Sequence, residues 1–111
     1  MMYKTKRQRK SAAQVILEAE TEKHFQAWVV ELARVYGWLT YHTWRSDNSQ
    51  PGFPDIVAIR RSRMIVLELK TEQGKVTPAQ DAWLDAFAEV PFVRAGVFRP
   101  SERQALEAMF R

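Results

Sequence analysis

Three charged residues stand at the ends of two short apolar runs, and their types suit metal-assisted hydrolysis. Asp55 precedes the run 56–59, and Glu68 and Lys70 end the run 64–70. The period of two in a strand places Glu68 and Lys70 on one side. Charge at the end of an apolar strand is costly unless it is paired or bound to metal. Two carboxylates and an amine suit a hard divalent cation such as Mg²⁺; the alternative is an edge ion pair between Lys70 and one acid.

A β-hairpin would bring these three residues together. Both runs are rich in Ile and Val, and the polar residues 60–63 join them, as in a hairpin. The first strand of a hairpin begins beside the end of the second, so we expect Asp55 to lie near Glu68 and Lys70. The opposite face of the second strand then carries three apolar side chains: Ile65, Leu67 and Leu69.

Hydrophobic spacing and capping signals predict the elements around this hairpin. A helix is expected over 22–36, between Thr21 as N-cap and Gly37 as its end. The other expected elements are a strand over 39–44, a helix from Thr77-Pro78 to 89 with Trp83, Leu84, Phe87 and Ala88 inward, a strand over 92–98, and a last helix capped by Ser101. A short helix within 11–20 is also possible. A helix between the third and fourth strands allows a parallel crossover, which predicts an α/β fold with a mixed sheet.

Charge is concentrated at the N-terminus. The net charge is +4, but outside positions 4, 6, 7, 9 and 10 the chain has 12 basic and 13 acidic residues. We therefore predict a flexible basic arm over 1–10 and a single domain over 11–111. The arm either contacts nucleic-acid phosphates or keeps the terminus soluble; its four cations nearest the domain are Lys6, Arg7, Arg9 and Lys10.

Composition excludes several other classes of site. The absence of cysteine removes disulfides, thiolate metal sites and cysteine nucleophiles. Only two histidines are present, so a histidine-rich zinc site is not expected, and His24 is interpreted as a surface residue. No apolar run approaches the ~20 residues of a membrane span, and no signal-peptide pattern is visible. We therefore predict a cytoplasmic protein without a membrane partner.

The residues around the two strands are similar to a nuclease signature. Pro54-Asp55 followed by Glu68-Leu69-Lys70 resembles the PD-(D/E)XK motif. The segments 52–57 and 70–80, with Glu22 and Gln26 on the first long helix, resemble the VRR-NUC branch of that superfamily over about 20–98. The resemblance implies a restriction-endonuclease-like mixed sheet of about four strands, in the order αβββαβα. It also implies hydrolysis of phosphodiester bonds with Mg²⁺ or Mn²⁺.

The resemblance also assigns roles to residues of the site. It implies that the metal is held by Asp55, Glu68, the Leu69 carbonyl and Glu22, while Lys70 orients the attacking water. The alternative for Glu22 is a first-turn acid that the helix dipole favours. If the helix is aligned differently with that of the family, Glu20 takes the place of Glu22. Gln80 either closes the capping box with Thr77 or reaches the site near Lys70, since one amide is expected to do one of these.

The function implied is structure-selective cutting of branched, flap or junction DNA. Symmetric cutting with one site per chain predicts a homodimer, for which the exposed aromatics among Trp38, Tyr41 and Trp44 are candidate contacts; the alternative for the tryptophans is core packing. The alternatives are a restriction-type endonuclease and a non-catalytic DNA-binding module. The setting expected is a bacterial or phage-infected cell, and further DNA contacts are expected from loop residues, namely Arg45, Ser46, Asn48 and Lys75.

Overall fold

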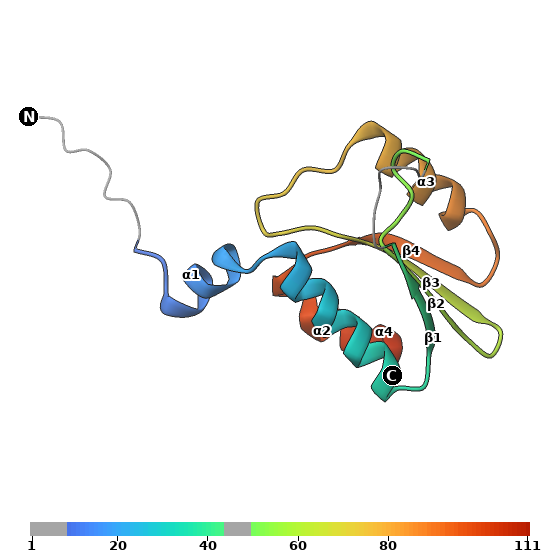
Figure 1. Ribbon diagram of the computed structural model, residues 1–111, viewed down its shortest axis with the longest axis horizontal. Coiled ribbons are helices and arrows are strands. Elements are labelled where there is room, and N and C mark those ends of the chain that lie inside the picture. The colour runs from blue at the N-terminus through green and yellow to red at the C-terminus, as the bar shows by residue number, and fades with distance from the viewer. Residues whose placement is uncertain (1–8, 44–49) are drawn as a thin grey trace, which may run out of the picture.

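A mixed β-sheet with helices on both faces makes up the part of the chain that the computed structural model describes, residues 9–43 and 50–111 (Figure 1). The expected order is confirmed, with a separate N-terminal helix and a 3-10 turn added. The elements are α1 (Ala12–Ala19), α2 (Glu22–Val35), β1 (Leu39–His42), β2 (Ile56–Arg60), β3 (Arg63–Leu69), α3 (Pro78–Ala88), β4 (Val93–Phe98), η1 (Pro100–Glu102) and α4 (Arg103–Phe110).

The strands of this sheet lie side by side in sequence order, β1-β2-β3-β4. β1, β2 and β3 are antiparallel neighbours, and β4 runs parallel to β3. The polar run 60–63 forms the predicted hairpin turn, in which Arg60 pairs with Arg63 and Arg61 takes a positive φ of 57°. α3 provides the crossover that a parallel pair requires. The sequence-based expectation of a restriction-endonuclease-like α/β fold is confirmed.

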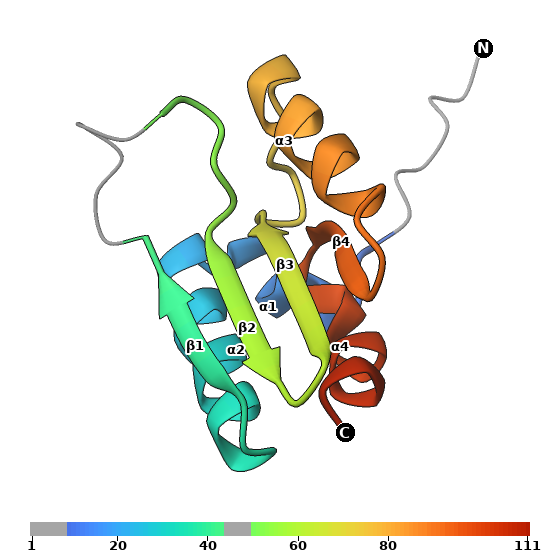
Figure 2. The same ribbon diagram turned by 90° about the vertical axis from the view of Figure 1, so that its right-hand side faces the viewer.

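The main core lies between the sheet and the layer formed by α2 and α4, which stand behind the strands in Figure 2. Side chains at helical spacing on α2 and α4 meet alternate side chains of β2 and β3, as the two periodicities require. The buried members from the sheet include the predicted Ile65, Leu67 and Leu69; those from the helices are Phe25, Val29, Ala33, Leu106, Met109 and Phe110.

The second face of the sheet is only half covered. α3 packs over β3 and β4, where Val66 and Leu84 are buried. The first two strands remain open on this side, and Leu39, Tyr41 and Ile59 are 76%, 62% and 42% exposed. The prediction that Ala88 points inward is wrong: it lies exposed in the last turn of α3. Ala88 is the last residue of α3 and lies beyond Leu84, the residue that this helix buries.

Trp38 belongs to the core, which was the alternative expected for a tryptophan, so it is not one of the exposed candidates for the dimer interface. Its side chain is 5% exposed, and its indole Nε1–H donates to the Phe110 carbonyl at 2.8 Å. The Phe110 ring meets it edge to face at a centroid distance of 5.5 Å. A buried indole needs both an apolar environment and a hydrogen-bond acceptor, and the end of α4 provides both.

The prediction that Ser101 caps the last helix is also wrong. The backbone N–H and hydroxyl of Ser101 donate to the Glu72 carboxylate at 2.6 and 3.2 Å, and α4 begins after η1. The Arg99 guanidinium donates to the carbonyls of Thr71 and Gly74 at 2.6 and 2.7 Å. These contacts fix the loop that follows β3 against the start of η1.

Helix α1 confirms the short helix considered for 11–20, with Ser11 as its N-cap. None of its residues is buried, and it extends away from the sheet (Figure 1). Among residues 9–43 and 50–111, no helix has the length and apolarity needed to span a membrane.

Candidate active site

Three carboxylates meet at the end of the sheet where β2 begins and β3 ends, beside the first turn of α2. Glu22 opens α2, Asp55 immediately precedes β2, and Glu68 is the penultimate residue of β3. One oxygen from each lies within 4.8 Å of the others. The hairpin register explains the pairing of the last two, since Ile56 lies opposite Leu67. The cluster therefore joins residues from three separate elements of the fold.

Backbone hydrogen bonds hold Asp55 in place. Its Oδ2 accepts the Leu69 N–H at 2.8 Å, and its carbonyl accepts the Thr43 N–H at 3.0 Å. The first bond ties the residue before β2 to the end of β3, while the second ties it to the end of β1. Leu69, predicted to contribute its carbonyl to a metal, thus contacts the cluster through its N–H group.

Glu68 is the least solvated acid of the cluster, at 2% exposure. Its Oε2 accepts the Gln80 Nε2–H at 3.2 Å and lies 3.7 Å from Lys70 Nζ. Its Oε1 is buried and has no hydrogen-bond partner among the described residues. A buried oxygen without a partner is costly unless something else satisfies it. An oxygen-preferring divalent cation fits this donor set.

The electrostatics of the cluster favour protonation in the absence of a cation. Burial, followed by the charge of Asp55, raises the pKa of Glu68 from 4.5 to about 8, although Lys70 opposes the shift. Burial and then Asp55 also raise the pKa of Glu22, again against the effect of Lys70. One ammonium does not neutralise three carboxylates at this distance. Binding of a cation to the cluster should therefore release protons from these carboxyl groups.

The Lys70 side chain lies inside the site rather than on its rim. It is 12% exposed, and the Lys70 N–H donates to the Phe98 carbonyl at 3.0 Å. The ion pair offered as the alternative reading does exist, between Lys70 and Glu68. It accounts for one of the three acids, so the ion pair and the acidic cluster are parts of one site.

The two interpretations of Gln80 turn out to be compatible. Its Oε1 accepts the Thr77 N–H at 2.9 Å, while its Nε2 donates to Glu68. The expectation that one amide serves either the capping box or the site is wrong, because the two ends of the amide face opposite partners. Gln80 therefore links the N-terminus of α3 to the buried acid.

Gly52 lets the loop before Asp55 lie directly against this helix end. Its φ is +86°, and a Cβ built there would stand 2.4 Å from the Ala79 carbonyl carbon and 2.7 Å from the Gln80 nitrogen. Only glycine combines this φ with so close an approach. The loop and the first turn of α3 are thus fixed to each other beside the cluster.

Glu22, rather than its fallback Glu20, joins the acidic cluster. Burial acts to raise the pKa of Glu20, but the hydrogen bonds and charges of Arg103 and His24 together outweigh burial and lower the pKa. His24 lies 3.1 Å from the same carboxylate and is exposed, as expected of a surface residue. Arg103 also stands over the Phe25 and Trp28 rings, so this group fastens α4 to α2.

The residues predicted to bind DNA are separate from the cluster or lie beyond the described ranges. Lys75 is exposed in the loop between β3 and α3. Arg9 and Lys10 are exposed before α1, where Lys10 pairs with Glu18. The remaining candidates lie outside the described residues: Lys6, Arg7, Arg45, Ser46 and Asn48. Trp44, a candidate dimer contact, also lies outside them.

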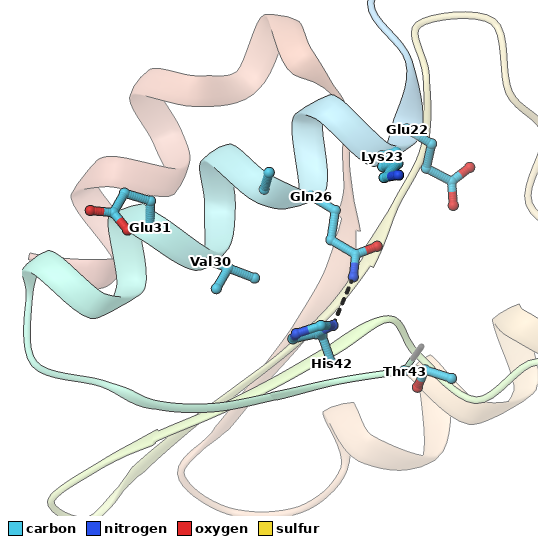
Figure 3. Close-up of a pocket in the computed structure, with 8 residues that line it drawn as sticks. Glu22, Lys23, Gln26, Val30, Glu31, His42 and Thr43 are labelled. Carbon is cyan, nitrogen blue, oxygen red and sulfur yellow. Dashed lines mark hydrogen bonds between the residues drawn. The ribbon is translucent and has the colours of Figure 1, made fainter. Parts of the chain in front are cut away.

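A pocket between α2 and β1, which the sequence did not indicate, adjoins the cluster through Glu22 (Figure 3). Its volume is about 700 Å³. Gln26 Nε2 and His42 Nδ1 meet across it at 3.3 Å. The alternation of β1 was the only available signal, since it places Thr40 and His42 on one face. The lining residues are Glu22, Lys23, Gln26, Ala27, Val30, Glu31, His42 and Thr43.

Comparison with known families gives one match. The family described as the VRR-NUC domain matches residues 2–99 of the 111-residue chain. The match includes the whole acidic cluster, Lys70 and Gln80, and it begins further toward the N-terminus than the resemblance seen in the motifs. Comparisons with curated proteins and with solved structures gave no significant match.

Proposed function

From the premise that this chain belongs to the VRR-NUC domain family, which makes it a nuclease, we propose that it is a metal-dependent endonuclease selective for branched, flap or junction DNA. The observation that carries the metal dependence is the buried, unpartnered Oε1 of Glu68 within a cluster of three carboxylates. Such a group is unfavourable by itself and favourable around a divalent cation.

The proposed ligands are Asp55, Glu68 and Glu22, with the Leu69 carbonyl as a further oxygen. A bound Mg²⁺ or Mn²⁺ supplies a water of lowered pKa and stabilises charge on the phosphate. The chain's own part is to hold the ligands in place. The Leu69 N–H orients Asp55, and the Gln80 amide orients Glu68.

Lys70 is proposed to act on the reacting groups directly. Its ammonium, held 3.7 Å from Glu68, donates hydrogen bonds to the attacking water and to the phosphate oxygens. The ammonium is a compact point charge with three donors, which suits contact with a phosphate. Its low exposure, 12%, limits competition from bulk solvent.

Contacts with DNA outside the site are proposed to be made with phosphates. Arg9, Lys10 and Lys75 are exposed cations of the described chain. Contacts of this kind fix position on DNA without reading bases, which agrees with selection by structure. Lys6, Arg7 and Arg45 are proposed to add to them, and the cytoplasm is the proposed compartment.

A homodimer is proposed for symmetric cutting, with the open side of β1 and β2 as its interface. Leu39, Tyr41 and Ile59 are exposed there although they are large and apolar. Neighbouring exposed apolar side chains favour association. A Leu39→Glu and Tyr41→Glu double variant should be monomeric in light scattering at a concentration where the parent chain is dimeric. A monomeric parent chain would contradict the dimer.

The nuclease proposal is tested with purified protein and labelled flap, four-way junction and duplex DNA. We expect cleavage with Mg²⁺ or Mn²⁺, none in EDTA, and preference for the branched substrates. Asp55→Asn and Lys70→Met should abolish cleavage but leave DNA binding in place. Asp85→Asn removes an exposed carboxylate of α3 and serves as the matched control. Full activity of Asp55→Asn would disprove the assigned site, and binding without any cleavage would favour a non-catalytic module.

A further inference from the structure

We propose that the pocket between α2 and β1 receives an unpaired nucleobase of the strand being cut, next to the scissile phosphate. This inference rests on the proposed nuclease function and adds a physical reason for its preference for branched DNA. The pocket's volume, about 700 Å³, lies within the ~300–1,000 Å³ usual for small-ligand sites.

The pocket and the acidic cluster share a residue. Glu22 lines one end of the pocket and also belongs to the group of three carboxylates. Thr43 lines the same region and donates its N–H to the Asp55 carbonyl. Figure 3 shows Glu22 at one end of the lining and Glu31 at the other. A strand whose phosphate lies at the cluster therefore has an adjoining nucleotide beside the pocket.

The lining has the chemistry of a base site. Ala27 and Val30 give it an apolar wall, which suits the face of a base. Gln26 and His42 place an amide and an imidazole in the pocket, where Gln26 Nε2 and His42 Nδ1 lie 3.3 Å apart (Figure 3). Proteins bind splayed-out bases through apolar or ring contacts to the face and hydrogen bonds to the edge.

The charge of the lining gives a phosphate no net attraction, whereas an uncharged ring does not need one. The lining carries two carboxylates, Glu22 and Glu31, against one ammonium, Lys23. Glu31 is itself paired with Arg34 at 2.6 Å on the solvent side. Because Lys23 is the only ammonium among the described residues that line the pocket, the lining has no excess of positive charge to attract a phosphate. The base is therefore the part of a nucleotide that fits.

This placement explains how a domain of this size could select structure. A base in a duplex is stacked and paired, so moving it into the pocket costs a few kcal/mol, whereas a base beside a nick, flap or branch is already partly released. The pocket then favours cutting near unpaired nucleotides without reading their identity.

The binding test uses a strand that carries 2-aminopurine, which becomes more fluorescent when it is unstacked. In EDTA, where no cutting occurs, we expect fluorescence to rise on binding when the probe lies within a nucleotide or two of the branch. Val30→Trp fills the pocket and should remove most of the rise. Val35→Trp is the matched control, because Val35 is an exposed valine of the same helix.

The cleavage test replaces the same nucleotide with an abasic site. We expect cutting by the parent chain to fall on the order of tenfold, as loss of a stacked base does elsewhere. The Gln26→Ala and His42→Ala double variant should show a much smaller difference between the two substrates. Thermal melting confirms that each variant is folded.

The outcomes separate the two proposals. A normal fluorescence response without any cleavage would support the pocket and disprove the nuclease proposal. Normal cleavage with no fluorescence response, or an equal response from folded Val30→Trp, would overturn the pocket inference and leave the nuclease proposal intact.

Discussion

The two ends of the β2–β3 hairpin both carry concentrated charge, but they use it in opposite ways. At the turn, Arg60 donates to the carbonyls of Tyr36 and Phe110 at 2.7 and 3.2 Å, and Arg63 donates to that of Met109 at 2.9 Å. Both guanidinium groups also stand over the Trp38 ring. At the open end, Glu68 is buried with one oxygen lacking any partner among the described residues.

The difference separates structural charge from functional charge. The arginines satisfy carbonyls at the C-terminal ends of α2 and α4, which intrahelical bonds leave without partners. Removing them should weaken the fold. The acids are held close together against their own repulsion, so removing one should spare or stabilise the metal-free fold and abolish the activity.

The largest effect is expected from Glu68→Gln. The amide keeps the size of the side chain but lacks the negative charge that holds a cation, so cleavage should fall on the order of 10³-fold or more, equivalent to ~4 kcal/mol of transition-state stabilisation. Single-turnover cleavage of a labelled flap measures this effect. Asp85→Asn should retain the parent rate. A Glu68→Gln rate close to that of the parent chain would show that Glu68 is not needed for cleavage.

The next effect concerns pH and the stability of the metal-free chain. Glu68 has a folded pKa of about 8, above its ordinary 4.5, so between these values the folded state keeps a proton that the unfolded state loses. Stability should therefore fall as pH rises from about 4.5 to about 8.

Melting in EDTA across this pH range measures that loss. The parent chain should lose roughly 5 °C or more of melting temperature relative to Glu68→Gln, which lacks the titrating group. Mg²⁺ or Mn²⁺ should restore stability most at the alkaline end, where the ligands are ionised. If melting temperature changed with pH in the same way for both chains, the pKa of Glu68 would not be raised in the folded state.

A smaller and opposite result is expected at the turn. Arg60→Ala should destabilise the fold by about 2 kcal/mol, because the Tyr36 carbonyl at the end of α2 and the Phe110 carbonyl at the end of α4 lose their charged donor. Cleavage per folded molecule should stay unchanged. Urea unfolding measures the stability, and active-site titration measures the cleavage per folded molecule. Loss of activity in a folded Arg60→Ala chain would show that the charges at the turn also serve catalysis.

The smallest effect is expected from Arg63→Ala. Arg63 donates to one carbonyl and stands 5.1 Å from the Trp38 ring centroid, so we expect a loss of about 1 kcal/mol. Urea unfolding of both variants in parallel compares the free energy of unfolding that each substitution removes. An Arg63 effect larger than that of Arg60 would contradict a ranking by contacts, because Arg60 donates to more carbonyls and stands closer to the ring, at 4.7 Å.

The hairpin and most of the acidic cluster were predictable from sequence because they depend on local periodicity. Alternation along β3 fixes which residues face α2, and a short turn fixes Asp55 beside Glu68. The position of Glu22 required the family resemblance, because spacing alone also allowed a first-turn acid.

The misses depend on contacts between residues far apart in the chain. Ser101 meets Glu72, and Trp38 meets Phe110, through tertiary packing that no local pattern specifies. Gln80 was underestimated because its two amide atoms serve partners on different elements. The pocket arises from the placement of α2 beside β1, which the sequence does not give.

The joining of hairpin acids to Glu22 of a separate helix has a consequence for folding kinetics. Asp55 and Glu68 can meet early through a short chain closure, whereas Glu22 arrives only when α2 docks. Repulsion would then be greatest at the last step, after the rate-limiting barrier. We expect Mg²⁺ to slow unfolding and leave refolding almost unchanged in stopped-flow experiments; equal acceleration of refolding would mean that the cluster assembles before the barrier.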